Sequence, residues 1–320
     1  MIGAEPTRST AENYRRFAEI QARGRSPRYE EFAAGIAGDP EVLALIDSLP
    51  PGKRQPNLVL GAVRFVTGDA DGYPELRPTL LDGWARIRSV VLARSTQTNE
   101  IGRCAALLPV LAGLPQPLAL LEVGASAGLC LRMDRYRYDY GVGEPLGPSD
   151  AAVTLRCELR GDTAPPSRLP GIAWRAGLDL APVDISDPDD VRWLETLVWP
   201  GQPERLARLR TALADAAAEP PRVIAGDLRT GLAEHLADAP PDATRVVLHS
   251  AVLAYLPPED REDFVRQVAE AGAIRIGFEG EQVLAGIAPT TGTPSSAFLI
   301  SRDDRVVARA DPHGAWLESL

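Results

Sequence analysis

The stretch that decides the fold is LALLEVGASAGL, residues Leu118–Leu129. A short apolar run ends in the acidic residue Glu122, and a turn of small residues and the start of a helix follow it. Parallel-sheet proteins build a nucleotide pocket in this way, at the carboxyl end of the first strand. Glu122 is therefore a candidate to bind a ribose hydroxyl, and Gly124, Ser126 and Gly128 form a turn that a ligand can approach closely.

The composition is that of a globular protein with a sizeable core. The chain has 320 residues, of which 45% are hydrophobic and 24% are charged, enough for one large domain or two ordinary ones. The formal net charge is −10. Proteins that bind nucleic acid or anionic membranes over their whole surface are usually basic, so we expect neither partner.

The few cysteines and the sequence of the N-terminus indicate a reducing compartment. Cys104, Cys130 and Cys157 are odd in number and widely spaced, which predicts neither a disulfide framework nor a zinc site. The first residues contain no apolar signal-peptide core, and no apolar run reaches the length of about 18 residues that a membrane span needs. We therefore expect a cytoplasmic protein.

The first part of the chain is typical of helices, and we expect an all-α domain over residues 1–115. Apolar residues recur there at helical spacing, without the alternation of a half-buried strand. Gly68–Pro78 is expected to be a turn-rich loop, because it contains the pair Asp71-Gly72. The expected helices are Ala11–Arg23, Glu30–Ala37, Pro40–Leu49, Pro56–Thr67, Asp82–Ala93 and Asn99–Leu114.

Over residues 116–320 short apolar runs alternate with helical stretches, the pattern of β-α-β units. Five parallel strands are expected, at Leu118–Val123, Ile172–Asp179, Arg222–Ala225, Arg245–His249 and Ala273–Phe278. The expected helices are Ser126–Arg135, Asp187–Val198, Pro203–Ala218, Gly231–Ala237 and Pro258–Ala271. A terminal antiparallel hairpin, Ser296–Ile300 with Arg305–Ala310, brings the expected sheet to seven strands.

One segment, about residues 136–160, does not fit this alternation. Tyr136–Tyr140 and Val153–Leu159 have the pattern of two further strands joined by a turn rich in Gly and Pro. We interpret them as a hairpin inserted after the first helix of the α/β domain. The alternative is that Val153–Leu159 is itself the second strand of the sheet.

Four strand ends, in this order along the chain, resemble a class I S-adenosylmethionine-dependent methyltransferase core. Glu122–Gly128 (EVGASAG) resembles the first motif of that family, and Ala176–Pro182 (AGLDLAP) resembles the end of its second strand. Val223–Leu228 (VIAGDL) and Val246–Pro258 (VVLHSAVLAYLPP) resemble the ends of the third and fourth strands. The resemblance implies a Rossmann-like, seven-stranded α/β sheet of the methyltransferase type.

The resemblance also implies roles for single residues. Asp179 would hold the ribose hydroxyls of S-adenosylmethionine, Asp227 would face the adenine amino group, and Glu122 with the glycine-rich turn would complete the cofactor site. Ser126 departs from the family pattern, because a glycine is usual there. Asp179 follows Gly128 by 51 positions, against about 20 in a simple β-α-β unit. Either the inserted hairpin absorbs the difference, or Glu158 is the ribose ligand instead.

His249 and Glu279 are the candidate catalytic residues. His249 ends the fourth expected strand, and an imidazole titrates near neutrality and suits acid–base work. Its alternative is a buried, hydrogen-bonded histidine that holds the following loop. Glu279 ends the fifth strand, where it either touches the substrate or is a carboxylate that is solvated or paired with an arginine. His235, His249 and His313 have no Cys or carboxylate at the spacing of metal ligands, so no metal site is expected.

The whole chain also resembles a bacterial family of unknown function that has a helical N-terminal half. Arg94–Cys104 (RSTQTNEIGRC) and the run Leu121–Gly141 carry this resemblance. Arg94–Glu100 contains more polar groups than the start of a helix requires. This cluster either lines the mouth of the pocket or forms a hydrogen-bonded joint between the two halves of the chain.

The sequence therefore favours a protein that binds S-adenosylmethionine and transfers its methyl group to a small-molecule acceptor, with the N-terminal helices over the pocket. Two alternatives stay open at this point. The first is a methyltransferase-like binding or scaffold protein without turnover. The second is a nicotinamide-dependent oxidoreductase, because a glycine-rich turn alone does not distinguish between nucleotides.

Overall fold

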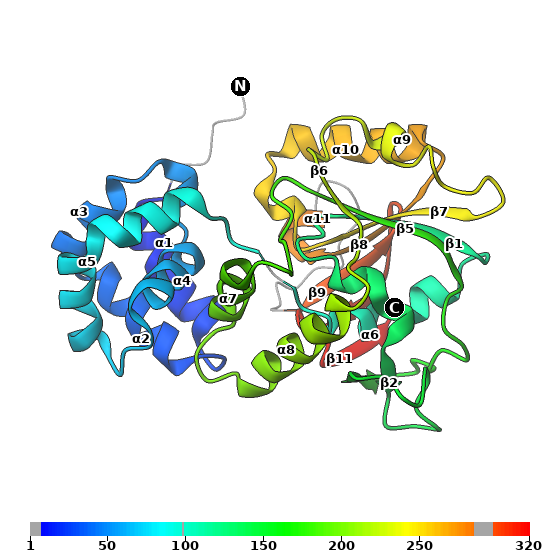
Figure 1. Ribbon diagram of the computed structural model, residues 1–320, viewed down its shortest axis with the longest axis horizontal. Coiled ribbons are helices and arrows are strands. Elements are labelled where there is room, and N and C mark those ends of the chain that lie inside the picture. Colours follow the sequence, from blue (N-terminus) through cyan, green and yellow to red (C-terminus); the bar gives the residue numbers. More distant parts are fainter. Residues whose placement is uncertain (1–7, 98, 285–296) are drawn as a thin grey trace. The chain divides into compact units, whose positions relative to one another are not determined.

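The computed structural model describes residues 8–97, 99–284 and 297–320. They form two compact units, which Figure 1 draws in one view. The first unit is the described part of Met1–Thr98 together with Asp187–Arg210, and the second is Asn99–Ser186 together with Thr211–Leu320. The boundary lies after Thr98 and not after residue 115, and the later segment Asp187–Arg210 belongs to the first unit.

The first unit is helical, in agreement with the sequence pattern. Ser9 and Glu12 form a capping box at the start of its first helix, and Asp39 caps the third helix through the backbone N–H groups of Glu41 and Val42. Its elements are α1 (Thr10–Arg16), η1 (Phe17–Ala22), α2 (Pro27–Ala37), α3 (Pro40–Asp47), η2 (Pro51–Lys53), α4 (Pro56–Thr67), α5 (Tyr73–Ala93), α7 (Pro188–Leu197) and the first part of α8 (Pro203–Ala217).

Part of the expected loop Gly68–Pro78 is helical instead. Helix α5 begins at Tyr73 and contains Pro78. Leu76 and Leu80 are both buried, and burial of these two side chains favours the helix over the turn that the glycine and proline content predicted.

The second unit contains a mixed sheet of nine strands in the order β4-β11-β10-β9-β8-β7-β1-β5-β6, rather than the expected seven. Its strands are β1 (Leu118–Val123), β4 (Glu158–Arg160), β5 (Ile172–Asp179), β6 (Val223–Ala225), β7 (Thr244–Ser250), β8 (Ile274–Gly280), β9 (Phe298–Arg302), β10 (Arg305–Ala310) and β11 (Trp316–Ser319). The protein thus has an α/β fold with a mixed central sheet and a helical N-terminal region. Ser296, where the terminal hairpin was expected to begin, lies outside the described residues.

Five neighbouring strands, β6, β5, β1, β7 and β8, are parallel, and β9 to β11 continue the sheet in antiparallel pairs. Numbered along the chain, the parallel strands have the order 3-2-1-4-5, which is that of a doubly wound sheet. The strand order reverses between β1 and β7, and ligands of such sheets bind beyond the carboxyl ends of the strands at this point.

The extra strands of residues 136–160 are not a hairpin. β2 (Arg137–Asp139) and β3 (Thr154–Arg156) pair in parallel as a separate sheet, with Tyr138 opposite Leu155 and both side chains buried. β4 instead joins the outer edge of the main sheet beside β11. The second strand of the parallel set is β5, so Val153–Leu159 does not take that place.

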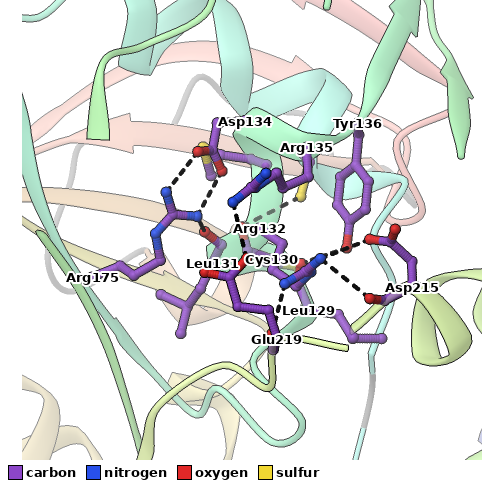
Figure 2. A network of polar contacts seen from close by, with 12 residues as sticks. Leu129, Cys130, Leu131, Arg132, Asp134, Arg135, Tyr136, Arg175, Asp215 and Glu219 are labelled. Atoms are coloured by element: carbon purple, nitrogen blue, oxygen red, sulfur yellow. Dashed lines mark hydrogen bonds and ion pairs between the residues drawn. The ribbon is translucent and has the colours of Figure 1, made fainter. Parts of the chain in front are cut away.

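The helix expected at Ser126–Arg135 is replaced by a 3-10 helix, η3 (Leu129–Arg135), which is interrupted at Arg132. Side chains donate hydrogen bonds to carbonyl groups that would accept from the backbone N–H groups of an α-helix. Tyr136 donates its hydroxyl to the carbonyl of Leu129 at 2.7 Å, and Arg175 donates Nη1 to that of Leu131 at 2.7 Å. Figure 2 shows these contacts together with Arg132, which donates to the carbonyl of Glu219 and to the carboxylate of Asp215.

The two faces of the main sheet have different coverings. The side chains of Leu121 and Val247 pack with α9 (Leu232–His235), α10 (Pro258–Glu270) and α11 (Glu281–Leu284) on one face, and Figure 1 shows α9 and α10 along that side. Successive side chains of a strand alternate between faces. Glu122 and Ser250 therefore point to the other face, where Arg103 of α6 (Arg103–Ala112) contacts Ser250. We call this second face the α6 face and the first one the α10 face.

Among the helices of the described residues, none is long and apolar enough to span a membrane.

Candidate functional site

The loop after β1 lies at the point where the strand order reverses. Gly124, Ser126 and Gly128 all adopt left-handed backbone conformations, with φ values of 70°, 53° and 69°. Glycine accepts this region freely, but a serine there costs on the order of 1 kcal/mol. A strained residue in a loop at a strand end is a marker of a functional site.

The backbone N–H groups of this loop donate to groups of the protein. Gly124 N donates to the carbonyl of Leu178 at 2.8 Å, and Ser126 N donates to Oδ2 of Asp179 at 2.8 Å. Asn99 holds the loop from the other side, donating Nδ2 to Ser126 Oγ at 2.8 Å and accepting from Ala127 N at 3.0 Å. The side chains of Asp179 and Asn99 therefore fix the strained turn.

Asp179 ends β5 and is half-buried. Its Oδ1 accepts from Ala181 N at 2.9 Å, and its Oδ2 accepts from Ser126 N. An ionised carboxylate offers about four acceptor positions, of which the backbone takes two. Asp179 can thus bind the hydroxyls of a sugar while it continues to hold the loop.

Glu122 lies on the same face of the sheet as Asp179, because it is in register with Gly177 two residues earlier on β5. Its side chain is almost completely buried, with 5% exposed, and Oε2 has no hydrogen-bond partner among the described residues. Burial, together with the neighbouring Cys130 and Asp179, raises its pKa well above the ordinary value. The shift favours the neutral acid, which can donate as well as accept a hydrogen bond.

Arg103 is the charged neighbour of Glu122, and sequence patterns did not indicate it. It is buried on the α6 face, where Nε donates to the carbonyl of Pro312 at 2.9 Å and Nη1 donates to Ser250 Oγ at 3.0 Å. Its positive charge opposes the rise of the Glu122 pKa. Because its partners follow it by about 150 and 210 positions in the chain, no local pattern could have identified it.

The glycines of the site allow close packing. A Cβ atom added at Gly124 would lie 2.6 Å from Cγ2 of Val252, and one added at Gly128 would lie 2.7 Å from Cβ of Pro221. The side chain of Val252 therefore occupies the space directly beyond Gly124. An adenosyl group fits this site in one respect and not in another. The carboxylate of Asp179 can still accept hydrogen bonds at the rim, but the group can approach Gly124 closely only if the side chain of Val252 moves.

Asp227 lies at the same rim, two residues beyond the end of β6. The chain here is tied to Asp179, whose carbonyl accepts from Gly226 N at 2.9 Å. The Asp227 carboxylate pairs with Arg229, whose Nε lies 2.9 Å from Oδ2, and this contact lowers the Asp227 pKa. A ligand at Asp227 would have to share the carboxylate with Arg229.

His249 and Glu279 form a buried pair on neighbouring strands, β7 and β8. Nδ1 of His249 lies 3.0 Å from Oε1 of Glu279, and neither side chain is exposed (0% for each residue). The same Oε1 accepts from the backbone N–H groups of Val252 at 3.0 Å and Leu253 at 3.1 Å. The ring of His249 packs edge-on against Phe264 of α10, with centroids 5.6 Å apart.

This pair points away from the rest of the expected site. His249 is in register with Val123 on β1, so its side chain lies on the face opposite to Glu122. Burial lowers the pKa of His249 and outweighs the opposing effect of Glu279. The structure therefore groups Glu122, the turn and Asp179 on the α6 face, and it places His249 and Glu279 under α10.

Two other expected features also separate. Arg94 pairs with Asp190 at 2.6 Å and Asp189 at 3.1 Å within the first unit, while Glu100 of the second unit is buried and accepts from Gly102 N at 3.0 Å. The residues Arg94–Glu100 are thus divided between the two units. Glu158, the alternative ribose ligand, lies on the outermost strand β4 and pairs with Arg160.

No group of three or more His, Cys, Asp or Glu side chains suitable for a metal ion occurs in the part of the chain that the structure describes.

A family model described as "Uncharacterized protein conserved in bacteria (DUF2332)" matches residues 11–319, and the chain belongs to this family. No curated protein and no solved structure matches the chain.

Proposed function

We propose that this protein binds S-adenosylmethionine at the rim formed by β1 and β5 and transfers its methyl group to a small-molecule acceptor. The observation that carries the proposal is the position of Asp179. Its half-buried carboxylate ends the second parallel strand and is hydrogen-bonded to Ser126 N in the turn after the first strand. In doubly wound nucleotide-binding proteins an acidic residue in this position binds the ribose hydroxyls.

Three residues on the α6 face would hold the cofactor. Asp179 would accept from the ribose hydroxyls, and Asn99 would keep the strained turn in place through Ser126 Oγ. Glu122 would offer its unpartnered Oε2 to a polar group of the ligand. When bound, the sulfonium cofactor supplies an electrophilic methyl group, so the protein has mainly to align the acceptor and exclude water.

His249 and Glu279 have a positioning role in this proposal. Glu279 accepts from the backbone N–H groups of Val252 and Leu253. His249, on the neighbouring strand β7, contacts the same carboxylate through Nδ1. Val252 in turn lies against Gly124. The buried pair therefore sets the position of the side chain that borders the turn, and no proton transfer is assigned to His249.

A second candidate function, a methyltransferase-like scaffold protein that neither binds the cofactor nor turns over, is favoured by the position of Val252. This side chain occupies the space beyond Gly124 that an adenosyl group would approach. The variant Val252→Ala separates the two functions. If the cofactor displaces Val252, the variant binds S-adenosylmethionine at least as tightly as the wild type, whereas a protein that does not use the cofactor shows no binding in either form.

Isothermal titration calorimetry with S-adenosylmethionine and S-adenosylhomocysteine tests the proposal. We expect both to bind, and we expect Asp179→Asn to weaken binding by about tenfold or more, because a carboxylate that accepts from hydroxyls is replaced by an amide. Asp242→Asn is the matched control, since Asp242 is exposed and precedes β7 at the opposite edge of the sheet. Absence of heat for both ligands would refute the proposal, and binding of NAD alone would favour the oxidoreductase.

A further inference from the structure

The first unit contains a hollow that the proposed cofactor site does not use. It has a volume of about 330 Å³ and is bordered by α4, α5 and α7. We call it the α4–α5–α7 pocket. Its volume falls at the lower end of the range of about 300–1,000 Å³ that small-molecule sites have. The lining residues are Phe65, Val66, Arg86, Ser89, Val90 and Arg192.

One side of this pocket is cationic. Arg86 is exposed on α5, and its guanidinium makes neither a hydrogen bond nor an ion pair within residues 8–97, 99–284 and 297–320. Other arginines of the same unit have carboxylate partners: Arg64 pairs with Asp69, and Arg94 pairs with Asp190. In a protein with a net charge of −10, an unpaired guanidinium in a hollow is a local site for an anion.

The rest of the lining is apolar apart from Ser89 and Arg192, and contacts within the unit hold part of it in place. The ring of Phe65 stacks under Arg192, whose Cζ lies 3.5 Å from the ring centroid, and meets Trp193 edge-on at 5.5 Å. Arg192 is fixed in turn, because it donates to the carbonyl of Phe65 at 3.0 Å and to Asp189 at 3.2 Å. The position of the Phe65 ring is therefore set by contacts within the protein, which lowers the entropic cost of binding against it.

We propose that the α4–α5–α7 pocket binds a small carboxylate with an apolar body. Arg86 binds the carboxylate, and the hydroxyl of Ser89, three residues further along α5 and thus on the same side of the helix, donates to it. The hydrocarbon body packs on Phe65, Val66 and Val90. This site shares no residue with the proposed cofactor site, so the two proposals can fail independently.

Calorimetric titration with three probes tests the assignment. Octanoate carries both the charge and the apolar body, acetate carries only the charge, and 1-octanol carries only the body. We expect octanoate to bind at least about tenfold more tightly than either of the others, because only octanoate contacts both sides of the pocket. Equal binding of octanol would reduce the pocket to an apolar patch, and equal binding of acetate would reduce it to a surface charge, so either result overturns the proposal.

Two arginines of one helix supply the matched variants. Arg86→Gln should weaken octanoate binding about tenfold, and Arg86→Lys should retain part of the affinity, because it keeps the charge but loses the bidentate geometry. Arg88→Gln is the control, since Arg88 is exposed on α5 but does not line the pocket. The thermal unfolding curve of each variant checks that the helices remain folded. Octanoate affinity that is unchanged in Arg86→Gln, or lowered equally in Arg88→Gln, would overturn the assignment.

Discussion

Glu122 and Glu279 are two buried glutamates at or near the carboxyl ends of strands in one sheet, and their surroundings differ. Oε1 of Glu279 meets the N–H groups of Val252 and Leu253 and the ring of His249. Oε2 of both glutamates has no partner in the described part of the chain, so the three contacts of its Oε1 are what sets Glu279 apart, and burial raises the pKa of Glu122. Burial alone therefore does not distinguish a structural acid from an acid that a ligand can use.

The difference between the two glutamates follows from the face of the sheet on which each lies. On the α10 face, Glu279 connects two strands and the loop after β7, and its partners fix it. On the α6 face, Glu122 lies beside the turn and Asp179, next to the half-buried rim. Substitutions on one face should therefore leave the contacts of the other face intact.

The largest effect is expected from Glu279→Ala, which leaves two backbone N–H groups and the ring of His249 without their acceptor. Removing one partner of such a buried network costs about 3–5 kcal/mol. The free energy of unfolding in urea measures this loss. Glu279→Gln is the matched control, because its amide oxygen can still accept the same bonds, and we expect it to lose less. Equal losses in the two variants would show that the acceptor is not what matters.

His249 should make stability depend on pH on the acidic side of neutrality. Burial lowers its pKa in the folded protein from the ordinary value of 6.5, so the unfolded chain binds a proton first. Its contribution to stability is complete above pH 6.5 and is lost as the pH falls below this value. Urea unfolding between pH 5 and 8, about the range in which a histidine changes charge, measures it, and His249→Phe should flatten the slope. A slope unchanged in the variant would contradict a buried neutral histidine.

Glu122 should produce a slope of opposite sign. Its pKa is raised above the ordinary value of 4.5 in the folded protein, so its contribution is complete below pH 4.5 and is lost as the pH rises through the higher, folded-state pKa. Glu122→Gln removes the ionisation and keeps the shape, so we expect the variant to be more stable than the wild type at neutral pH. Urea unfolding at pH 4.5 and pH 8 compares the two proteins. A variant that is less stable at both values would show that Glu122 has a structural partner.

The smallest effects are expected from relief of backbone strain on the two sides. Ala251 has a φ of 55°, and Ala251→Gly should stabilise the protein by about 0.5 kcal/mol, the balance between relieved strain and the greater entropy of glycine in the unfolded chain. Ser126→Gly relieves a similar strain but loses the bond to Asn99, so it should not stabilise. Thermal unfolding of the two variants measures the difference, and an equal gain in both would show that the contact with Asn99 adds no stability.

The sequence predicted the parallel part of the sheet better than the rest of the second unit. β1 and β5 have the expected bounds, and β1 is a fully buried, mostly apolar run between Pro117 and Gly124, which identifies a buried strand. The 3-10 helix η3 was not predictable from local pattern, because the groups that replace its helical hydrogen bonds include Arg175, more than 40 positions away. The parallel pairing of β2 with β3 likewise depends on contacts across the chain.

The members of the candidate site were partly predictable, but their orientation was not. Acidic residues at strand ends identified Glu122, Asp179 and Asp227. The face on which each side chain lies depends on the register between strands, which sequence alone did not supply, so His249 and Glu279 were assigned to the same site as Glu122. Asn99 and Val252 lie within segments that the sequence analysis singled out, Arg94–Glu100 and Val246–Pro258, but their contacts with the turn were not predicted because they reach it from other parts of the chain.

The central claim is that the α6 face of the rim at Asp179 holds an adenosyl group, and a crystal structure grown with saturating S-adenosylhomocysteine tests it most directly. We predict electron density for the ribose within hydrogen-bonding distance of the Asp179 carboxylate, with Val252 displaced from Gly124 and the His249–Glu279 pair unchanged. Density for the ligand elsewhere, or a rim left empty with Val252 in place at saturation, would contradict the claim.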